Sequence, residues 1–347
     1  MASPPGGNSR PLRFLLPVLV VVGLLVIYQF VWRGGEDALV VYCAHDSVYS
    51  QQVLDGFTRE TGIRVVPVFD TEATKSLGLV ERLVREQSNP RCDVFWNNQL
   101  LGMLDLAGRG LLVPYKGSGY ERIPPAYRDP EGYWVGFAAR FRVYIVNTGK
   151  LAATPEAIAG RLGGDLSRVT IAKPLYGTTL THYSVLWHHW GGEKLKAWHA
   201  GLRSRGIREA TGNAHVKNLV AEGVCDLGFT DTDDFFVARD EGKPVAMLPV
   251  RLESGATLCM PNTVGIIKGT RRLVRAQRLV DYLLSAASEL ELAGSKARQV
   301  PLGPVDASRL GDDVRVLASW VADGVPLGGL GPARAACLAW LKTEYVR

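Results

Sequence analysis

Beyond residue 37, the first half of the chain alternates between short apolar runs and segments whose apolar residues recur every three or four positions. The short runs predict buried strands, and the periodic segments predict helices. Strands are expected at residues 38–43, 63–69 and 93–96, and helices at 47–61, 77–87 and 99–107. Because each strand precedes a helix and the connections are short, the pattern favours right-handed βαβ units and a parallel sheet.

A second α/β region begins near Gly136, with the same mixture of short apolar runs and amphipathic segments. It predicts strands at residues 142–146, 169–172, 224–229 and 263–267, and helices at 275–287 and 333–345. Polar clusters follow the strands in both regions, and open α/β sheets bind ligands beyond the carboxyl ends of their strands. We therefore expect two lobes that face one cleft.

The longest apolar run lies near the N-terminus, at residues 14–32, and Gln29 alone interrupts it. As a helix, its 19 residues are about 28 Å long, which is enough to span a bilayer core. Arg10 and Arg13 precede it, so the N-terminus is expected in the cytoplasm and the remainder outside. The run ends without the small residues that signal peptidase requires, so we expect an uncleaved anchor. A cleaved signal and a buried helix are the alternatives.

Composition and charge exclude several classes of protein. The 347 residues suffice for two domains, and 47% hydrophobic with 21% charged residues excludes a disordered chain and a polytopic membrane protein. Three of the 40 Lys and Arg lie in the first 33 residues, so 37 face the 34 acidic residues. That balance argues against a nucleic-acid partner. The five cysteines include no C-x-x-C pair; buried free thiols are expected, with one disulfide as the alternative.

Residues 230–234 read Thr-Asp-Thr-Asp-Asp and form the densest acidic cluster of the chain. Capping of the following helix explains one or two of these acids, because carboxylates at a helix start satisfy free N–H groups. Three acids in four positions favour contact with a cation, an ammonium group or a metal. Neither the Gly nor the later Glu of a calcium loop follows.

Two further clusters suit an anion. Gly177-Thr178-Thr179 joins a predicted strand to a helix, where backbone N–H groups and hydroxyls can receive one. Arg140 and Arg142 alternate along a strand, so both can reach one carboxylate or phosphate, with a salt bridge across the sheet as the alternative. Four histidines follow in one predicted helical stretch, and only His182, beside the Gly-Thr-Thr turn, is a site candidate.

A series of short motifs in fixed order resembles extracellular solute-binding proteins of ABC importers, in the branch labelled ferric-iron-binding. The motifs lie at residues 41–46, 57–63, 70–73, 90–98, 140–142, 174–182, 212–213, 228–234 and 261–264. The resemblance covers about residues 38–302. It implies an α/β, two-lobed type II periplasmic-binding-protein fold with a hinge, preceded by one N-terminal transmembrane or signal helix.

The resemblance also implies the domain limits and the partners. Residues 38–137 with about 262–305 would form lobe 1, residues 138–261 lobe 2, and residues 306–347 a C-terminal helical segment that packs back on the lobes. Residues 1–33 would be the signal anchor. The protein would be a periplasmic monomer, tethered by residues 14–32 or secreted after signal cleavage, that delivers its ligand to an ABC permease.

The iron ligands of that family do not carry over to this chain. The family uses a His after the first strand, a Glu after the third strand and two adjacent Tyr in the second lobe, and an anion completes the shell. Alignment places Asp46, with His45 beside it, at the His position, Asn98 at the Glu position and Asp233-Asp234 at the Tyr pair. The missing Tyr pair argues against iron held by phenolates, and another metal cation or an organic cation fits as well. The expected ligand is therefore iron or another metal cation, or a small zwitterionic or anionic solute. A zwitterion would satisfy both halves of the site.

The predicted ligand-binding residues come from both lobes. They are Asp46, Thr71, Glu72, Asn97 and Asn98 from the first, and Arg140, Thr178, Thr179, His182, Asn213, Asp231, Asp233 and Asp234 from the second. Asp46, Asp233 and Asp234 are the candidate metal ligands, and no other cofactor is expected. Crowded carboxylates of this kind should raise the pKa of some members.

A binding protein repurposed as a sensory or interaction module is the main alternative function. A metal-assisted hydrolase is the other alternative. No nucleophile with its base appears in the sequence, so the chain is not expected to be an enzyme.

Overall fold

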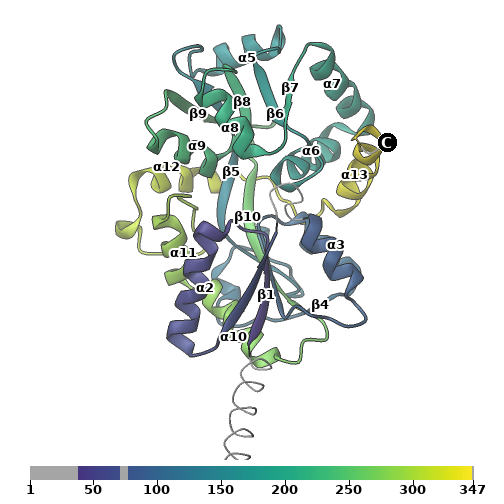
Figure 1. Cartoon of the computed structure of the whole chain (residues 1–347), viewed down its shortest axis with the longest axis vertical. Coiled ribbons are helices and arrows are strands. Elements are labelled where there is room, and N and C mark those ends of the chain that lie inside the picture. Colours follow the sequence, from purple (N-terminus) through teal and green to yellow (C-terminus); the bar gives the residue numbers. More distant parts are fainter. Residues whose placement is uncertain (1–37, 71–76, 346–347) are drawn as a thin grey trace, which may run out of the picture.

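The computed structural model describes residues 38–70 and 77–345. The predicted anchor at residues 14–32 and the candidates Thr71 and Glu72 lie outside the described residues. Figure 1 shows two groups of strands and helices, one above the other, joined by the long strands β5 (Val135–Asn147) and β10 (Cys259–Ile267). Within the described ranges, no helix is both long and apolar enough to cross a membrane.

The lower group in Figure 1 is built from βαβ units. Its elements are β1 (Leu39–Cys43), α2 (Ser47–Thr61), β2 (Val65–Phe69), α3 (Leu77–Arg85), β3 (Val94–Asn97), α4 (Leu101–Gly108), β4 (Leu112–Val113), α10 (Leu273–Leu283) and α11 (Ala286–Gly294). Strand β1 pairs in parallel with β2 and β3, as predicted. Helix α2 begins and ends where its apolar spacing predicts, because Gly62 adopts the left-handed conformation (φ 71°) that closes a helix.

The upper group repeats this arrangement. Its elements are α5 (Pro155–Gly163), β6 (Val169–Ala172), α6 (Gly177–Trp190), α7 (Gly192–Ser204), β7 (Arg208–Ala210), α8 (Asn213–Ala221), β8 (Leu227–Asp231), α9 (Thr232–Asp240) and β9 (Val245–Pro249). Strand β6 pairs in parallel with β7 and β8. The predicted single helical stretch with four histidines is two helices, because Gly191 at φ 81° ends α6.

The two groups share one sheet, whose strand order is β2-β1-β3-β10-β5-β8-β6-β7. The parallel pairing predicted for the first three strands is confirmed, whereas the long strands β10 and β5 run antiparallel to their neighbours. Strand β5 pairs with β10 up to Phe141 and with β8 and β9 from Arg142 onward. The strand predicted at 142–146 is therefore only the second half of β5. Arg140, which was expected to precede the strand, lies within β5.

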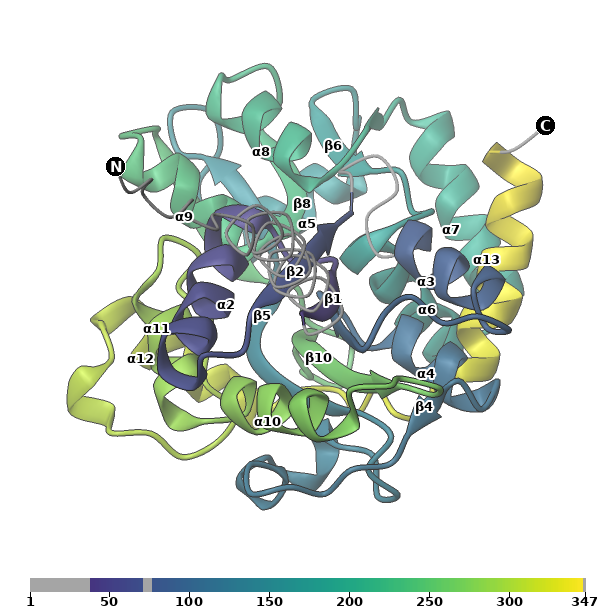
Figure 2. The same cartoon turned by 60° about the horizontal axis from the view of Figure 1, so that its bottom comes forward.

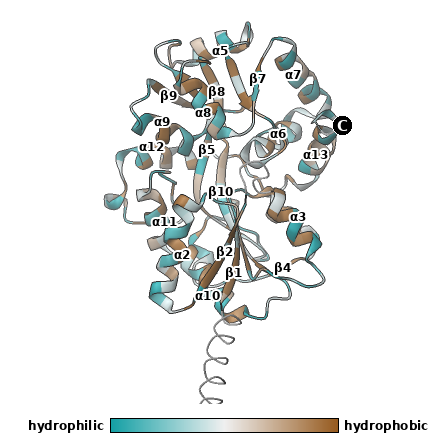
Figure 3. Ribbon diagram, viewed as in Figure 1, coloured by the Kyte–Doolittle hydropathy of each residue, from teal (hydrophilic) through white to brown (hydrophobic). Residues whose placement is uncertain are grey.

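Two hydrophobic cores lie on opposite faces of the sheet because side chains alternate along each strand. In β1, Leu39 and Val41 join the core under α2, α10 and α11, whereas Tyr42 joins the core under α3 and α4. Figure 2 shows α2 and α11 on one side of β1, and α3 and α4 on the other. Figure 3 shows apolar residues along β1 and β2 and polar residues on outer helices such as α7.

The C-terminal part forms α12 (Asp312–Val321) and α13 (Gly331–Tyr345). Helix α13 packs against α6 of the upper group and α4 of the lower group. The helix predicted at 275–287 is instead divided between α10 and α11, since the Ser285 hydroxyl caps a new helix by accepting from the Ser288 N–H. All five cysteines are buried and free, as expected.

Candidate functional site

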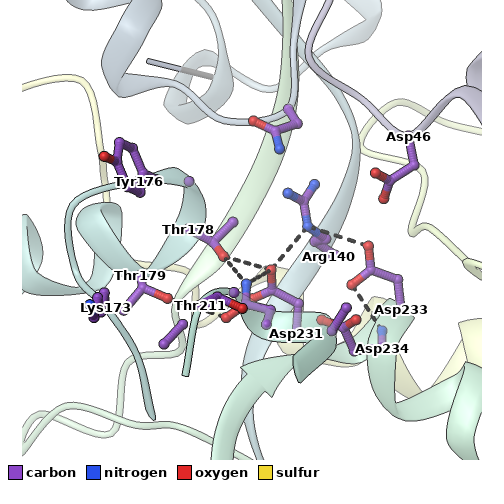
Figure 4. Close-up of a pocket in the computed structure, with 16 residues that line it drawn as sticks. Asp46, Arg140, Lys173, Tyr176, Thr178, Thr179, Thr211, Asp231, Asp233 and Asp234 are labelled. Atoms are coloured by element: carbon purple, nitrogen blue, oxygen red, sulfur yellow. Dashed lines mark hydrogen bonds and ion pairs between the residues drawn. The ribbon is translucent and has the colours of Figure 1, made fainter. Parts of the chain in front are cut away.

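A cavity of about 230 Å³ is lined from both groups of elements. Lining residues share one kind of position: most follow a strand or begin a helix, as ligand sites in open α/β sheets do. They are Asp46, Asn98, Arg140, Ala172, Lys173, Tyr176, Gly177, Thr178, Thr179, Thr211, Gly212, Asn213, Ala214, Asp231, Asp233 and Asp234. Figure 4 shows Arg140 between Asp46 on one side and Thr178 on the other, with Asp233 close by.

Two helices begin at this cavity. Neither the start of α6 nor that of α8 has its N–H groups capped by a side chain within the described structure. Gly177 opens α6 at φ 53°, a left-handed conformation that strains any residue with a Cβ. The first N–H groups of a helix have no partner inside the helix and carry a partial positive charge. The cavity wall is therefore suited to an anion.

Asp231 organises a buried network directly beneath the cavity. Its carboxylate accepts hydrogen bonds from Arg142 Nη1 at 2.8 Å, the Thr178 hydroxyl at 2.6 Å and Asn213 Nδ2 at 3.0 Å. Arg140 Nε donates to the same carboxylate at 3.4 Å. Burial alone would raise the pKa of Asp231, but Arg142, Arg140 and the Thr178 hydroxyl outweigh it and hold that pKa below its usual range. The predicted rise in pKa for some members of the cluster therefore does not apply to Asp231.

Arg140 combines a buried position with an unused donor. Its side chain is 4% exposed, and its Nε forms ion pairs with Asp231 at 3.4 Å and Asp233 at 3.6 Å. Burial would lower its pKa, but Asp233, Asp231 and Asp46 raise it. Its Nη1, like Oδ1 of buried Asn98, has no hydrogen-bond partner among the described residues. Buried polar groups are nearly always paired, so this donor and this acceptor suit a ligand or water.

The other two aspartates of the acidic cluster lie in the first turn of α9, where they complement the helix dipole. Asp233 accepts the Asp234 N–H at 3.1 Å, and Asp234 accepts the Thr230 hydroxyl at 2.8 Å. Asp231 occupies the N-cap position of α9, but its side chain makes no capping bond. Oxygens of the three carboxylates lie within 4.8 Å of one another. Capping thus accounts for part of the cluster and leaves carboxylate oxygens at the cavity.

Most of the predicted site residues come together at this cavity. Those that line it are Asp46, Asn98, Arg140, Thr178, Thr179, Asn213, Asp231, Asp233 and Asp234. Asn97 and His182 do not line it. Asn97 is the last residue of β3, where it accepts the N–H of Asn98. His182 lies a full turn along α6 from Thr178, about 6 Å deeper.

Three polar lining residues, Lys173, Tyr176 and Thr211, are not among the predicted ligand-binding residues. Each had a usable signal. Lys173 directly follows a strand, Tyr176 directly precedes the Gly-Thr-Thr turn, and Thr211 precedes the Gly-Asn pair that begins α8. Including every polar residue at a strand end would have selected them.

Comparison with known proteins gives a consistent result in sequence. No family model matches the chain. "Iron uptake protein A1" of Synechocystis sp. is 25% identical over 87% of this chain and 85% of its own length. "Fe(3+)-binding periplasmic protein" of Serratia marcescens is 27% identical over 60% and 61%. "Putative 2-aminoethylphosphonate-binding periplasmic protein" of Salmonella typhi is 20% identical over 75% and 77%.

Solved structures show the same fold. Iron-bound HitA from Pseudomonas aeruginosa matches with a TM-score of 0.76 and 18% identity, over 89% of this chain and 99% of its own. AfuA from Actinobacillus pleuropneumoniae with bound fructose-6-phosphate matches with a TM-score of 0.69 and 18% identity, over 88% and 98%. The expected periplasmic-binding-protein fold is thereby confirmed. In sequence the chain is similar to proteins named for iron uptake and periplasmic Fe(3+) binding, and in fold it is similar to solved ferric-binding proteins.

Proposed function

We propose that this chain captures a small zwitterionic solute in the cavity between its two lobes and delivers it to an ABC permease. An anionic group, such as a phosphonate or phosphate, would lie at the starts of α6 and α8. An ammonium group would lie against Asp46, Asp233 and Asp234. One observation carries the proposal: a single cavity joins two uncapped helix N-termini and an unused Arg140 donor to three carboxylates.

The anion half rests on backbone N–H donors at the starts of α6 and α8, which side-chain bonds already hold in place. The Thr178 hydroxyl and the Asn213 amide donate to the Asp231 carboxylate at 2.6 and 3.0 Å, and the Thr179 hydroxyl donates to Asn213 Oδ1 at 3.2 Å. Lys173 adds a positive charge at the cavity wall. A site whose donors are fixed before binding loses little entropy when the ligand arrives, which favours affinity.

The cation half rests on the charge of the lining. Four carboxylates, including Asp231, line the cavity against two cationic side chains, Arg140 and Lys173. Arg142, behind the wall, balances Asp231 at 2.8 Å. Asp46, Asp233 and Asp234 therefore bring three further carboxylates to the cavity wall. Because these carboxylates repel one another when water is excluded, a ligand ammonium would favour closure.

A metal cation held by Asp46, Asp233 and Asp234 is the second candidate. The short distances between the carboxylates of Asp231, Asp233 and Asp234 favour it. Two contacts weaken this candidate. Asp231 already accepts from Arg142, Thr178 and Asn213. Arg140 lies 3.6 Å from Asp233, so a metal there would approach a guanidinium group. Tyr176 is the one phenol among the lining residues, so the described residues offer no phenolate pair.

A curated relative and a solved structure support an anion-bearing ligand. One relative is named for 2-aminoethylphosphonate, a zwitterion with both required groups, and one solved structure holds fructose-6-phosphate. The relatives named for ferric iron support a metal instead. Since both kinds of ligand occur among the relatives, the choice depends on this chain's own residues.

Lobe boundaries and motion belong to the same proposal. The lobes would meet where β5 and β10 change neighbours, near Ala138 at φ 42° and the bulge between Met260 and Asn262. Hinge closure around a ligand is typical of two-lobed binding proteins. Residues 14–32 would tether the protein to the outer face of the inner membrane, beside its permease.

Calorimetry with two matched ligands tests the proposal. 2-Aminoethylphosphonate carries both groups, and ethylphosphonate lacks only the amine. A hydrogen bond to a charged group contributes roughly 1.5–3 kcal/mol, so the full chain should bind the zwitterion at least roughly tenfold more tightly. Replacing both Asp233 and Asp234 by Asn should remove that preference. The control is Glu241→Gln, which removes one charge at the far end of α9, where the side chain is exposed.

Two outcomes would contradict the proposal. If the double Asn variant kept the preference, the aspartates would act only as helix caps, since Asn caps as well as Asp. If ferric ion bound without any organic anion and displaced the phosphonate, the metal candidate would replace the zwitterion.

A further inference from the structure

A second cavity, of about 150 Å³, lies deeper along α6, and none of the residues that line it lines the first cavity. Helix α6 contributes His182, Leu186 and Trp190 to its wall. Helix α7 contributes Trp198, and β8 contributes Phe229. Residues 250–253, which follow β9, complete the lining, so the cavity lies within the upper group.

Aromatic rings form much of the wall. Trp190 and Trp198 meet edge to face with centroids 5.8 Å apart, and Tyr144 and Phe229 lie 5.0 Å apart. Flat apolar walls match the faces of a planar ring, and an apolar cavity of about 150 Å³ is known to accept benzene. The size and the lining both fit one small aromatic molecule.

One polar group in this wall has no partner. The His182 side chain is 2% exposed, and its Nδ1 makes no hydrogen bond to any residue that the structure describes. Burial, with help from Arg142, lowers the pKa of His182 to about 3, so the ring is neutral at neutral pH. A buried polar atom without a partner is costly, and a ligand hydroxyl could supply one.

The charged residues at the rim already have partners for their polar groups. Arg205 donates to the carbonyls of Gly201 and Leu162, at 3.0 and 2.7 Å. Arg251 pairs with Asp323 at 3.1 Å, and Glu253 pairs with Lys194 at 3.2 Å. Because these bonds engage the rim groups and most of the remaining lining is apolar or aromatic, a neutral molecule suits the cavity best.

We propose that this cavity is a second ligand site, which takes a small neutral aromatic molecule whose single hydroxyl or ring N–H hydrogen-bonds His182 Nδ1. The site is separate from the solute cavity and does not depend on the solute proposed there. His182 also lies against Phe229, with ring centroids 6.1 Å apart, and Arg142 Nη2 donates to the Phe229 carbonyl at 3.3 Å. A bound molecule would thus lie behind Arg142, whose positive charge compensates the Asp231 carboxylate.

Phenol and toluene are matched probes, because they have nearly the same shape and differ in the hydroxyl. Titration of the full chain, followed by tryptophan fluorescence and calorimetry, should give saturable phenol binding with a Kd of about 1 mM or tighter. Toluene should bind roughly tenfold more weakly, because it leaves His182 Nδ1 unpaired. His182→Leu should abolish or reverse this preference.

A second variant keeps the test decisive if His182→Leu does not fold. Leu162, half-buried on α5, lines the cavity, and Leu162→Phe should fill part of it and weaken both probes at least tenfold. Leu151→Phe, at a half-buried position outside the cavity, is the control and should bind both probes normally. Absence of saturable phenol binding, equal phenol preference in His182→Leu, or unchanged binding in a folded Leu162→Phe would each overturn the proposal.

Discussion

Replacing Asp231 by Asn should destabilise the protein by about 3–5 kcal/mol, which is the usual cost of removing one charged partner from a buried ion pair. The side chain of Arg142 is fully buried, and Asp231, at 2.8 Å, is the carboxylate with which it forms a salt bridge. Asparagine keeps the shape of aspartate but removes the charge, and its amide group would direct N–H donors at Arg142, Thr178 or Asn213. The guanidinium group of Arg142 would then stay buried without its counter-charge.

Asp234→Asn is the matched control on the next element. Asp234 is half-buried, and among its contacts is a neutral hydrogen bond that it accepts from the Thr230 hydroxyl at 2.8 Å. An asparagine oxygen can accept the same bond, so the loss should stay below about 1 kcal/mol.

Urea unfolding followed by circular dichroism measures both changes. At roughly 2–4 °C per kcal/mol, the Asp231 variant should also melt on the order of 6–20 °C lower. If the two variants lost the same stability, within about 0.5 kcal/mol, the assignment of Asp231 as the centre of the buried network would be refuted.

Three further predictions concern acid stability, closure and the membrane. The pKa of Asp231 is lower in the folded chain than its ordinary 3.8, so the stability that this carboxylate adds to the fold is complete above that value and is lost as the pH falls through the folded pKa. Acidification should therefore lower the free energy of unfolding more in the wild type than in Asp231→Asn. Equal losses in the two proteins would contradict this. Small-angle scattering should show a smaller radius of gyration with saturating 2-aminoethylphosphonate; an unchanged radius under demonstrated binding would exclude closure. The full chain should fractionate with membranes, whereas deletion of residues 1–33 should leave a soluble binding domain; N-terminal sequencing of a secreted form that begins near Gly34 would refute the anchor.

Local elements were largely predictable from the sequence because their signals are local. The apolar spacing of residues 47–61 and the following glycine determine α2, and the apolar run at 169–172 is strand β6 in full. Strand pairing was not predictable in the same way. Nothing in the sequence of β10 indicates that it runs antiparallel between β3 and β5, since that direction follows from the chain's return from the upper group.

The candidate site was predictable in its position and less so in its roles. Strand-end reasoning brought together Asp46, Asn98 and the α9 acids, which are far apart in the sequence. It could not distinguish Asp231, which organises the buried network, from Asp233 at the cavity. That difference depends on Arg142 of β5, whose side chain donates to the Asp231 carboxylate. His182, predicted for the solute site, lines the second cavity, because sequence distance from a turn does not give depth along a helix.

Native mass spectrometry of the full chain, purified from its own host, can show whether the solute cavity holds an organic molecule with an anionic group. The Arg140→Lys variant is the comparison, because lysine keeps a charge near Asp231 and Asp233 but loses the unused Nη1 donor. We expect a bound small organic species on the wild type that is depleted in this variant. A mass increment of ferric ion alone, or an organic species held equally by both proteins, would contradict it.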